Sequence, residues 1–176
     1  MDLWQKKQFQ VLISYYDAEE YLDRALLSLE RSMRGFDWVL IFGGDSFQKE
    51  THAKIERYSK TSSAKEIVHN VYDKAINVST AKNRLLKEGL KYSKEYPGIL
   101  VMDADDEMTE ERPRLIETAI KYDSPYIVGA WSYQTKNNLK LIHAKSATTR
   151  LAFTSCCTLL HTDMIPKSGR FFYDKI

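Results

Sequence analysis

The sequence is poor in cysteine. Only two of its 176 residues are cysteines, the adjacent Cys156 and Cys157, and no third cysteine is present to pair with either. This usage excludes a small secreted scaffold held together by disulfides and favours a reducing compartment. Both cysteines lie in an apolar run, and we interpret them as small buried residues.

Long hydrophobic runs and an excess of one charge are also lacking. No apolar run is long enough to cross a bilayer, and residues 1–8 have no signal-peptide pattern. We therefore expect a cytoplasmic protein, or the cytoplasmic part of a longer one, with no transmembrane segment. The net charge is only +2 and no block of like charge stands out, so nucleic acid is not an expected partner.

What the sequence does contain is the make-up of one globular domain. Hydrophobic residues are 43% and charged residues 28% of a chain long enough to bury a sizeable core. Strand and helix patterns then alternate four times. Strands are expected at 9–16, 38–42, 66–71 and 98–102, and helices from Asp17 (as N-cap) to Gly35, over 48–60, from Ser79 or Thr80 to Pro97, and from Glu110 to Tyr122. This alternation predicts a largely parallel sheet with helices on both faces.

The pattern changes after Pro125. Three strands are expected without intervening helices, at 126–134, 139–144 and 151–161, with a hairpin turn at 136–138 between the first two. This predicts a small antiparallel part at the C-terminal end.

Three carboxylates, Asp103, Asp105 and Asp106, follow the apolar run 98–102. They fall where a buried strand ends, which is where open α/β sheets bind ligands. Placing these charges together is unfavourable unless a cation or hydrogen bonds compensate them, and hard carboxylate oxygens suit Mg²⁺ or Mn²⁺. The alternative is a solvated acidic turn that caps the helix starting near Thr109.

Four loops are expected to gather at the carboxyl edge of the parallel strands, at 14–17, 43–46, 79–84 and 103–106. They supply an aromatic surface, glycines that permit close backbone approach, cations and carboxylates. A nucleoside diphosphate requires such a set of groups.

In their order and spacing these segments resemble the family 2 glycosyltransferases, across about residues 9–120. The matching pieces are Ser14–Leu22, Gly43–Ser46, Ala81–Arg84 and Asp103–Asp106. The resemblance implies the α/β GT-A fold, with a mostly parallel central sheet flanked by helices. It implies one domain over 1–176, divided into a nucleotide-binding half (about 9–122) and an acceptor-side part (about 123–176).

The resemblance also implies the activity: transfer of a sugar, with inversion, from a nucleotide-diphosphate sugar to an acceptor hydroxyl, with Mn²⁺ or Mg²⁺ as cofactor. A UDP sugar is the first expectation for the donor; the acceptor is a glycan, a protein or a lipid-linked sugar. The donor-binding residues implied are Ser14, Tyr15, Asp45, Lys82, Arg84, Asp103, Ala104 and Asp105. The metal ligands implied are Asp105, Asp103 and Asp106, with His161 as a further candidate.

The sequence departs from the family pattern at three places. Gly43 and Gly44 stand where the family has an acid, and Lys82 stands where it commonly has arginine. The family's catalytic Glu-Asp pair does not follow the stretch 168–174, which resembles the approach to it. Either the sequence is a piece of a longer protein or another residue serves as base, and Asp174 and Asp163 are the late carboxylates.

Three other functions share features with this pattern. Haloacid-dehalogenase-like phosphatases place Asp-x-Asp after the first strand, whereas here it follows the fourth. Nucleotidyltransferases need a glycine-rich first loop for a triphosphate, and the stretch 14–17 contains no glycine. A non-catalytic nucleotide-sugar-binding module, or a domain of a larger protein, remains the alternative.

Overall fold

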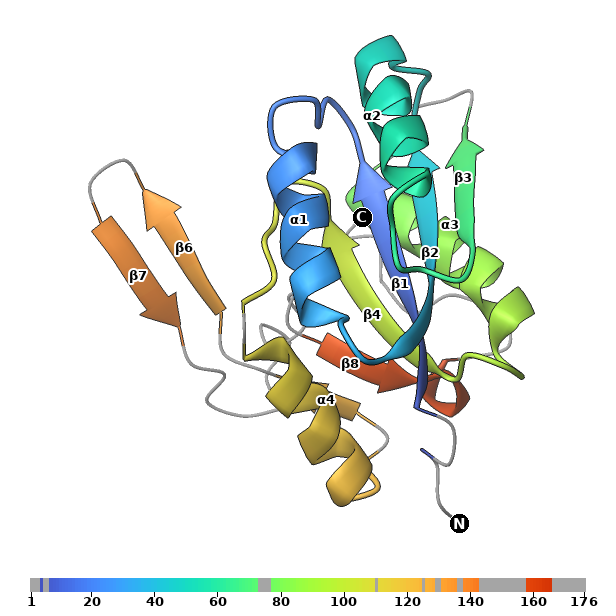
Figure 1. The fold of residues 1–176 in the computed structure, drawn as a ribbon, viewed down its shortest axis with the longest axis vertical. Helices are drawn as coiled ribbons and strands as arrows, with labels where there is room; N and C mark the ends of the chain where they lie inside the picture. The colour runs from blue at the N-terminus through green and yellow to red at the C-terminus, as the bar shows by residue number, and fades with distance from the viewer. Residues whose placement is uncertain are drawn as a thin grey trace.

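The computed structural model describes residues 4, 7–72, 77–109, 111–124, 126–128, 131–135, 138–142 and 158–165. Its centre is a six-stranded sheet with the order β3-β2-β1-β4-β8-β5, and β6 and β7 form a separate two-stranded ribbon that stands apart from it (Figure 1). The strands are β1 (Gln8–Tyr15), β2 (Asp37–Gly44), β3 (Ile67–Val71), β4 (Gly98–Asp103), β5 (Tyr126–Val128), β6 (Trp131–Thr135), β7 (Asn138–Ile142) and β8 (Thr158–His161). The helices are α1 (Leu22–Ser32), α2 (Lys49–Ser59), α3 (Val78–Gly89) and α4 (Arg112–Lys121), with short 3₁₀ turns at Leu90–Tyr92 and Thr162–Met164.

Four parallel strands form the core of the sheet. Strand β1 lies between β2 and β4, parallel to both, and β3 extends the sheet beyond β2. Strand β8 runs antiparallel to both β4 and β5. Because the four parallel strands point the same way, the loops that follow them meet at one edge of the sheet. This arrangement confirms the predicted α/β architecture.

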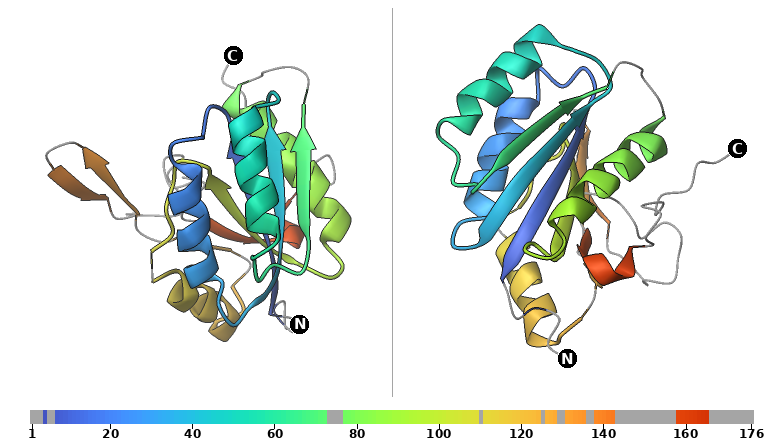
Figure 2. Two further views of the ribbon diagram at one scale, coloured as in Figure 1. Left: turned by 45° about the horizontal axis from the view of Figure 1, so that its top comes forward. Right: turned by 90° about the vertical axis from the view of Figure 1, so that its right-hand side faces the viewer.

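Helices cover both faces of the sheet (Figure 2). Alternate residues of β1, such as Val11 and Ile13, pack against α1, α2 and α4 in one core. The intervening Leu12 packs with Leu85 and Leu86 of α3 in a second core on the opposite face. Burial on both faces explains why the strands read as continuous apolar runs.

Two predicted helix starts need correction. Asp17 does not cap α1: it has a positive φ of 50°, and α1 begins only at Leu22, after Tyr21, with no side-chain cap. Aspartate tolerates this left-handed conformation, which turns the chain before the helix starts. Helix α3 begins at Val78, and its cap is Asn77, whose side chain accepts a hydrogen bond from Thr80 N.

Other predicted bounds also change. The third helix ends at Gly89 and continues only as a 3₁₀ turn, so it does not reach Pro97. The stretch predicted as one strand over 126–134 forms two strands in different sheets. Strands β6 and β7, on either side of the predicted turn, pair antiparallel, and residues 136–137 of that turn lie outside the described residues. Residues 151–157, with Cys156 and Cys157, lie outside the described residues.

No helix in the described part of the chain is both long and apolar enough to span a membrane.

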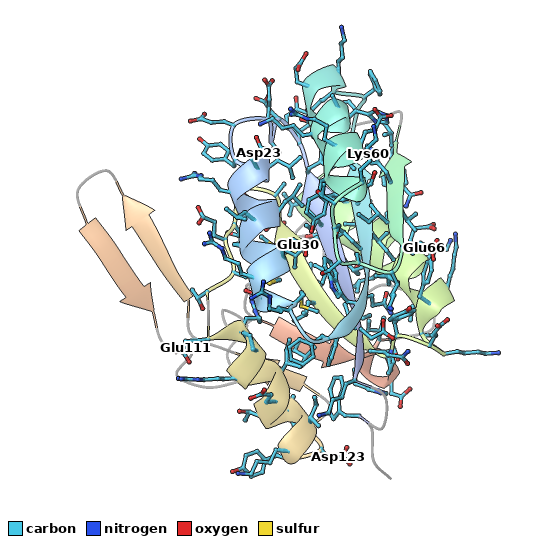
Figure 3. All side chains as sticks on the ribbon, viewed as in Figure 1. Asp23, Glu30, Lys60, Glu66, Glu111 and Asp123 are labelled. Atoms are coloured by element: carbon cyan, nitrogen blue, oxygen red, sulfur yellow. The ribbon has the colours of Figure 1, made fainter. Side chains whose placement is uncertain are left out.

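Glu30 joins α1 to the loop that follows α2 (Figure 3). Its carboxylate accepts hydrogen bonds from the hydroxyls of Tyr58, Ser62 and Ser63, and from the Ser63 backbone N–H. Burial alone would raise the pKa of Glu30, but these donors outweigh burial and lower it. The ionised carboxylate therefore helps to hold α1 and α2 together on one face of the sheet.

We expect Glu30→Gln to lower the free energy of unfolding at pH 7 by about 1–2 kcal/mol, since an amide cannot accept all four bonds. The pKa of Glu30 is lower in the folded protein, so its contribution is present above the unfolded-state pKa and is lost as pH falls through the folded one. Urea unfolding of both proteins between pH 3 and 7 measures this. A difference that stays constant down to the lowest pH would contradict the role, and Glu117→Gln, on the exposed side of α4, is the control.

Candidate functional site

A cavity of about 420 Å³ lies at the carboxyl edge of the parallel strands. Residues that follow β1, β2 and β4 line it, together with the first turn of α3. Six of the residues predicted from the sequence line this one cavity: Ser14, Tyr15, Asp45, Asp103, Ala104 and Asp105. A pocket at this position in an α/β sheet is the usual place for a ligand.

On the α3 side of the sheet, Asp103 is held by two side chains. Ser14 pairs with Asp103 across β1 and β4, and its hydroxyl donates to Asp103 Oδ1 over 2.8 Å. Lys82 of α3 places its Nζ 2.8 Å from Asp103 Oδ2. The Lys82 side chain is only 9% exposed and that of Asp103 is 31% exposed. The charge of Asp103 is thus compensated inside the protein, by the lysine that stands where the family commonly has arginine.

Asp105 and Asp106 lie in the turn that follows β4. The backbone N–H of Asp106 donates to the carbonyl of Asp103 and closes the turn. Asp105 is exposed and lines the cavity, whereas Asp106 is half-buried. Of the three neighbouring carboxylates, Asp105 is therefore the one that both faces the cavity and is open to solvent.

On the face of the sheet opposite to α3, the Tyr15 side chain points towards His69 on β3. Its hydroxyl lies 2.6 Å from His69 Nε2, and the residue is 5% exposed although it borders the cavity. Burial raises the pKa of Tyr15 to about 12. Burial, with a smaller contribution from His52, lowers the pKa of His69 to about 4, so a neutral phenol meets a neutral imidazole.

The position of Tyr15 explains the glycine at position 44. A Cβ atom on Gly44 would lie 2.2–2.5 Å from three atoms of the Tyr15 phenol. No larger side chain fits there while Tyr15 occupies this space, so an acid at position 44 is sterically excluded. Asp45 is the first carboxylate after β2.

Asp45 carries a buried acceptor without a donor. The residue is 8% exposed, lines the cavity, and its Oδ1 has no hydrogen-bond partner among the described residues. Within the same part of the chain, two buried groups at and just after the end of neighbouring β3 also lack partners, Asn70 Nδ2 and the Tyr72 hydroxyl. Buried polar atoms without partners are unfavourable and are satisfied by ordered water, an ion or a ligand.

Several other predicted residues lie elsewhere. The Arg84 guanidinium sits 4.9 Å from the centre of the Tyr72 ring, in a cation–π contact. His161 pairs with Gly98 at the start of β4, five residues or about 17 Å from Asp103 at its end. His161 packs edge-on against Trp4, and the exposed Asp163 lies beside it. The structure therefore does not bring His161 or Asp163 to the cavity. Asp174 lies outside the described residues.

Within the described ranges, no three histidine, cysteine or acidic side chains gather as a metal site would require. Mg²⁺ and Mn²⁺ do not need such a cluster when substrate phosphates complete the coordination, because one or two protein carboxylates then suffice. The exposed carboxylate of Asp105 fits this second mode.

Reasoning from the sequence missed His69, Asn70 and Tyr72. The sequence did contain a signal for the face of the sheet on which His69 and Asn70 lie, because residues two apart on a strand share a face. His69 falls on the α1/α2 face with Ile67, and Asn70 falls on the other face with Val68. What the sequence does not provide is the register that sets Asn70 opposite Gly43.

We expect Gly44→Ala to destabilise the protein by about 1–3 kcal/mol and to displace the Tyr15 ring, since the added methyl overlaps it. Gly43→Ala is the matched control on the same strand: its methyl would meet side-chain atoms of Leu85 at 2.8 Å and 3.0 Å, a milder overlap. Thermal unfolding of the two variants tests the difference. Equal stability of Gly44→Ala and the wild type would show that the Tyr15 ring does not fill this space.

Solved structures similar to this chain include two that hold a nucleotide-diphosphate sugar. One is the structure of residues 1–349 of S. aureus TarS in complex with UDP-GlcNAc. The alignment covers 88% of this chain and 45% of the TarS chain, at 17% identity and a TM-score of 0.69. The mannosyltransferase PcManGT from Pyrobaculum calidifontis, in complex with GDP-Man and Mn²⁺, aligns with 77% of this chain and 37% of its own, at 14% identity and a TM-score of 0.55. The chain thus spans less than half the length of these proteins, and they show its fold.

No curated protein sequence matches the chain significantly. The sequence profile of the family described as "Glycosyl transferase family 2" does match it, over residues 10–173. That match covers the parallel sheet, the cavity and the acidic turn. The chain belongs to glycosyl transferase family 2, and its fold is that of the GT-A glycosyltransferases.

Proposed function

We propose that this domain binds a nucleotide-diphosphate sugar in the cavity at the carboxyl edge of the sheet and transfers the sugar to an acceptor hydroxyl. The observation that carries this proposal is the buried, unpartnered Oδ1 of Asp45 in the same cavity as Asp103 and Asp105. Membership of glycosyl transferase family 2 supports it. So does the cavity volume of about 420 Å³, which falls within the range of small-molecule sites.

The donor nucleotide we propose is UDP. Uracil presents an N–H between two carbonyls, so it offers one donor to Asp45 Oδ1 and an acceptor to an amide such as Asn70 Nδ2. Guanine also has an N–H beside a carbonyl, and thymine has the same N–H between two carbonyls as uracil, so GDP and dTDP are the competitors to test. A deoxyribose lacks the 2′-hydroxyl available to Asp103, which would favour UDP over dTDP. TarS forms complexes with UDP and with UDP-GlcNAc, which is consistent with the first choice.

The remaining site residues we assign to the ribose and the diphosphate. Asp103, fixed by Ser14 and Lys82, is an oriented acceptor for ribose hydroxyls, and the buried Lys82 ammonium contributes positive charge near the phosphates. Asp105, with Asp106 beside it, would hold Mn²⁺ or Mg²⁺. Such an ion would neutralise charge on the departing diphosphate.

We propose that transfer proceeds with inversion, as the resemblance to family 2 implies. The acceptor hydroxyl then attacks the anomeric carbon from the side opposite the diphosphate while a base removes its proton. Asp45 and Asp103 are poorly suited to act as this base, because we assign both to the donor. The acceptor is a glycan, a protein or a lipid-linked sugar.

A donor-binding module without transferase activity is the second candidate. It is favoured by the position of Asp163, one of the two late carboxylates that could serve as the base. Asp163 lies beside β8 near the start of β4 and not at the cavity, so it cannot remove a proton there. A transferase releases UDP from a UDP sugar in the presence of acceptor, or slowly with water as acceptor. A pure binding module releases none over the same period.

We expect calorimetric titration to show binding of UDP in preference to GDP and dTDP, with affinity increased by Mn²⁺. Asp105→Ala should abolish the Mn²⁺ effect and retain part of the metal-free binding, because Asp105 is assigned to the ion alone. Asp23→Ala is the matched control, an exposed acid on α1 that pairs with Lys54 outside the cavity. Absence of binding by all three nucleotides would contradict the proposal.

Asp45→Ala should separate binding from stability. We expect it to weaken UDP binding by about tenfold or more, since a charge-assisted hydrogen bond is lost. The free energy of unfolding should not fall, because the variant removes a buried acceptor for which the described residues provide no donor. Asp45→Asn keeps a neutral acceptor, so its UDP affinity should lie between that of the wild type and that of Asp45→Ala. A marked loss of stability with unchanged UDP affinity would instead assign Asp45 to the turn.

A further inference from the structure

A column of three rings runs from the cavity into the α1/α2 side of the protein. It begins with Tyr15 on β1, whose hydroxyl lies 2.6 Å from His69 Nε2 on β3. The His69 ring then faces the His52 ring of α2, with 4.7 Å between ring centres and 34° between planes. Three separate elements thus contribute one ring each, and only Tyr15 lines the cavity.

Two phenylalanines contact the histidines of this column. Phe42 packs edge-on against His69 at 6.0 Å, and Phe47 lies 5.2 Å from His52. The Nε2 of His52 lies 3.4 Å from the Glu56 carboxylate, one helical turn along α2. Each ring therefore has neighbours that restrict its orientation, and displacement of one ring leaves a gap against the next.

Tyr15 depends on this column for its orientation. The neighbouring position on β2 is Gly44, which has no side chain to restrict the phenol. A buried hydroxyl requires a hydrogen-bond partner, and His69 supplies one. At neutral pH His69 is uncharged, so its hydrogen bond with Tyr15 joins two neutral groups. It therefore adds no charge next to the cavity.

We propose that His69 is a positioning residue for the donor site: its hydrogen bond to Tyr15, supported by the ring contact with His52, fixes the phenol as one wall of the nucleotide cavity. The proposal rests on the proposed function, because it assumes that a nucleotide occupies this cavity. His69 acts only through Tyr15, since neither histidine lines the cavity itself. Loss of either partner in the bond should therefore have the same effect on the ligand.

A double-mutant cycle tests this directly. UDP dissociation constants are measured by calorimetry for the wild type, Tyr15→Phe, His69→Phe and the double variant. We expect each single variant to weaken binding by about 3- to 30-fold and the double variant to be no weaker than the weaker single one. His69→Gln, which restores a hydrogen-bonding group, should recover part of the affinity.

Two controls separate positioning from general destabilisation. Tyr58→Phe removes the hydroxyl of a half-buried tyrosine, one bonded to Glu30 outside the cavity, and should lower stability without changing UDP affinity. Urea unfolding of every variant, at the temperature used for binding, shows that each is folded. A purely structural role for His69 would lower stability while leaving the dissociation constant unchanged.

The outcomes are distinct. Wild-type affinity in His69→Phe, or effects of the two single variants that multiply in the double variant, would overturn this inference and leave the proposed function standing. Failure of the wild type to bind UDP, GDP and dTDP would overturn both. Matched losses in the two single variants with no further loss in the double variant would establish the coupling.

Discussion

The parallel pairing of β1 with β2 and β4 is the constraint on which the site depends. It places Ser14 opposite both Gly43 and Asp103, and Tyr15 opposite Gly44. Consecutive residues of a strand point to opposite faces, so Ser14 turns towards α3 and Tyr15 towards α2. One strand end therefore supplies both sides of the cavity. The α3 side is charged, through Asp103 and Lys82, and the α2 side is aromatic.

Electrostatics inside the site follow from this division. Asp103 is neutralised by a lysine that is itself almost buried, so its geometry is fixed before any ligand arrives. Asp105 faces solvent and is available to an ion or a phosphate-bound cation. Asp45 is buried and has no donor in the described part of the chain, so its Oδ1 could accept a hydrogen bond from a ligand N–H. The three acids thus differ in environment, which supports three different roles.

Much of this could be predicted from the sequence, for identifiable reasons. Apolar runs such as 98–102 end in polar residues, so the strands and the edge where their loops meet follow from periodicity alone. The ordered motifs indicated the family correctly. The start of α1 was missed because Asp17 resembles an N-cap residue, whereas its positive φ makes it part of a turn. The His69–Tyr15 contact was missed because it depends on strand order and register, which span 54 residues of sequence. The position of His161 at the start of β4 could not be predicted for the same reason, since it follows from antiparallel pairing.

A backbone NMR titration of the isotopically labelled domain with UDP and Mg²⁺ tests whether the nucleotide binds at the carboxyl edge of the sheet. A second, larger hollow of about 680 Å³ lies at the opposite edge of the sheet, bordered by Gln8, Asp37 and Lys94, and it serves as an internal reference. We predict shift changes at Ser14, Asp45 and Asp105, with none at the opposite edge. Shift changes confined to the second hollow, or no shift changes at saturating UDP, would contradict binding of the nucleotide at the carboxyl edge.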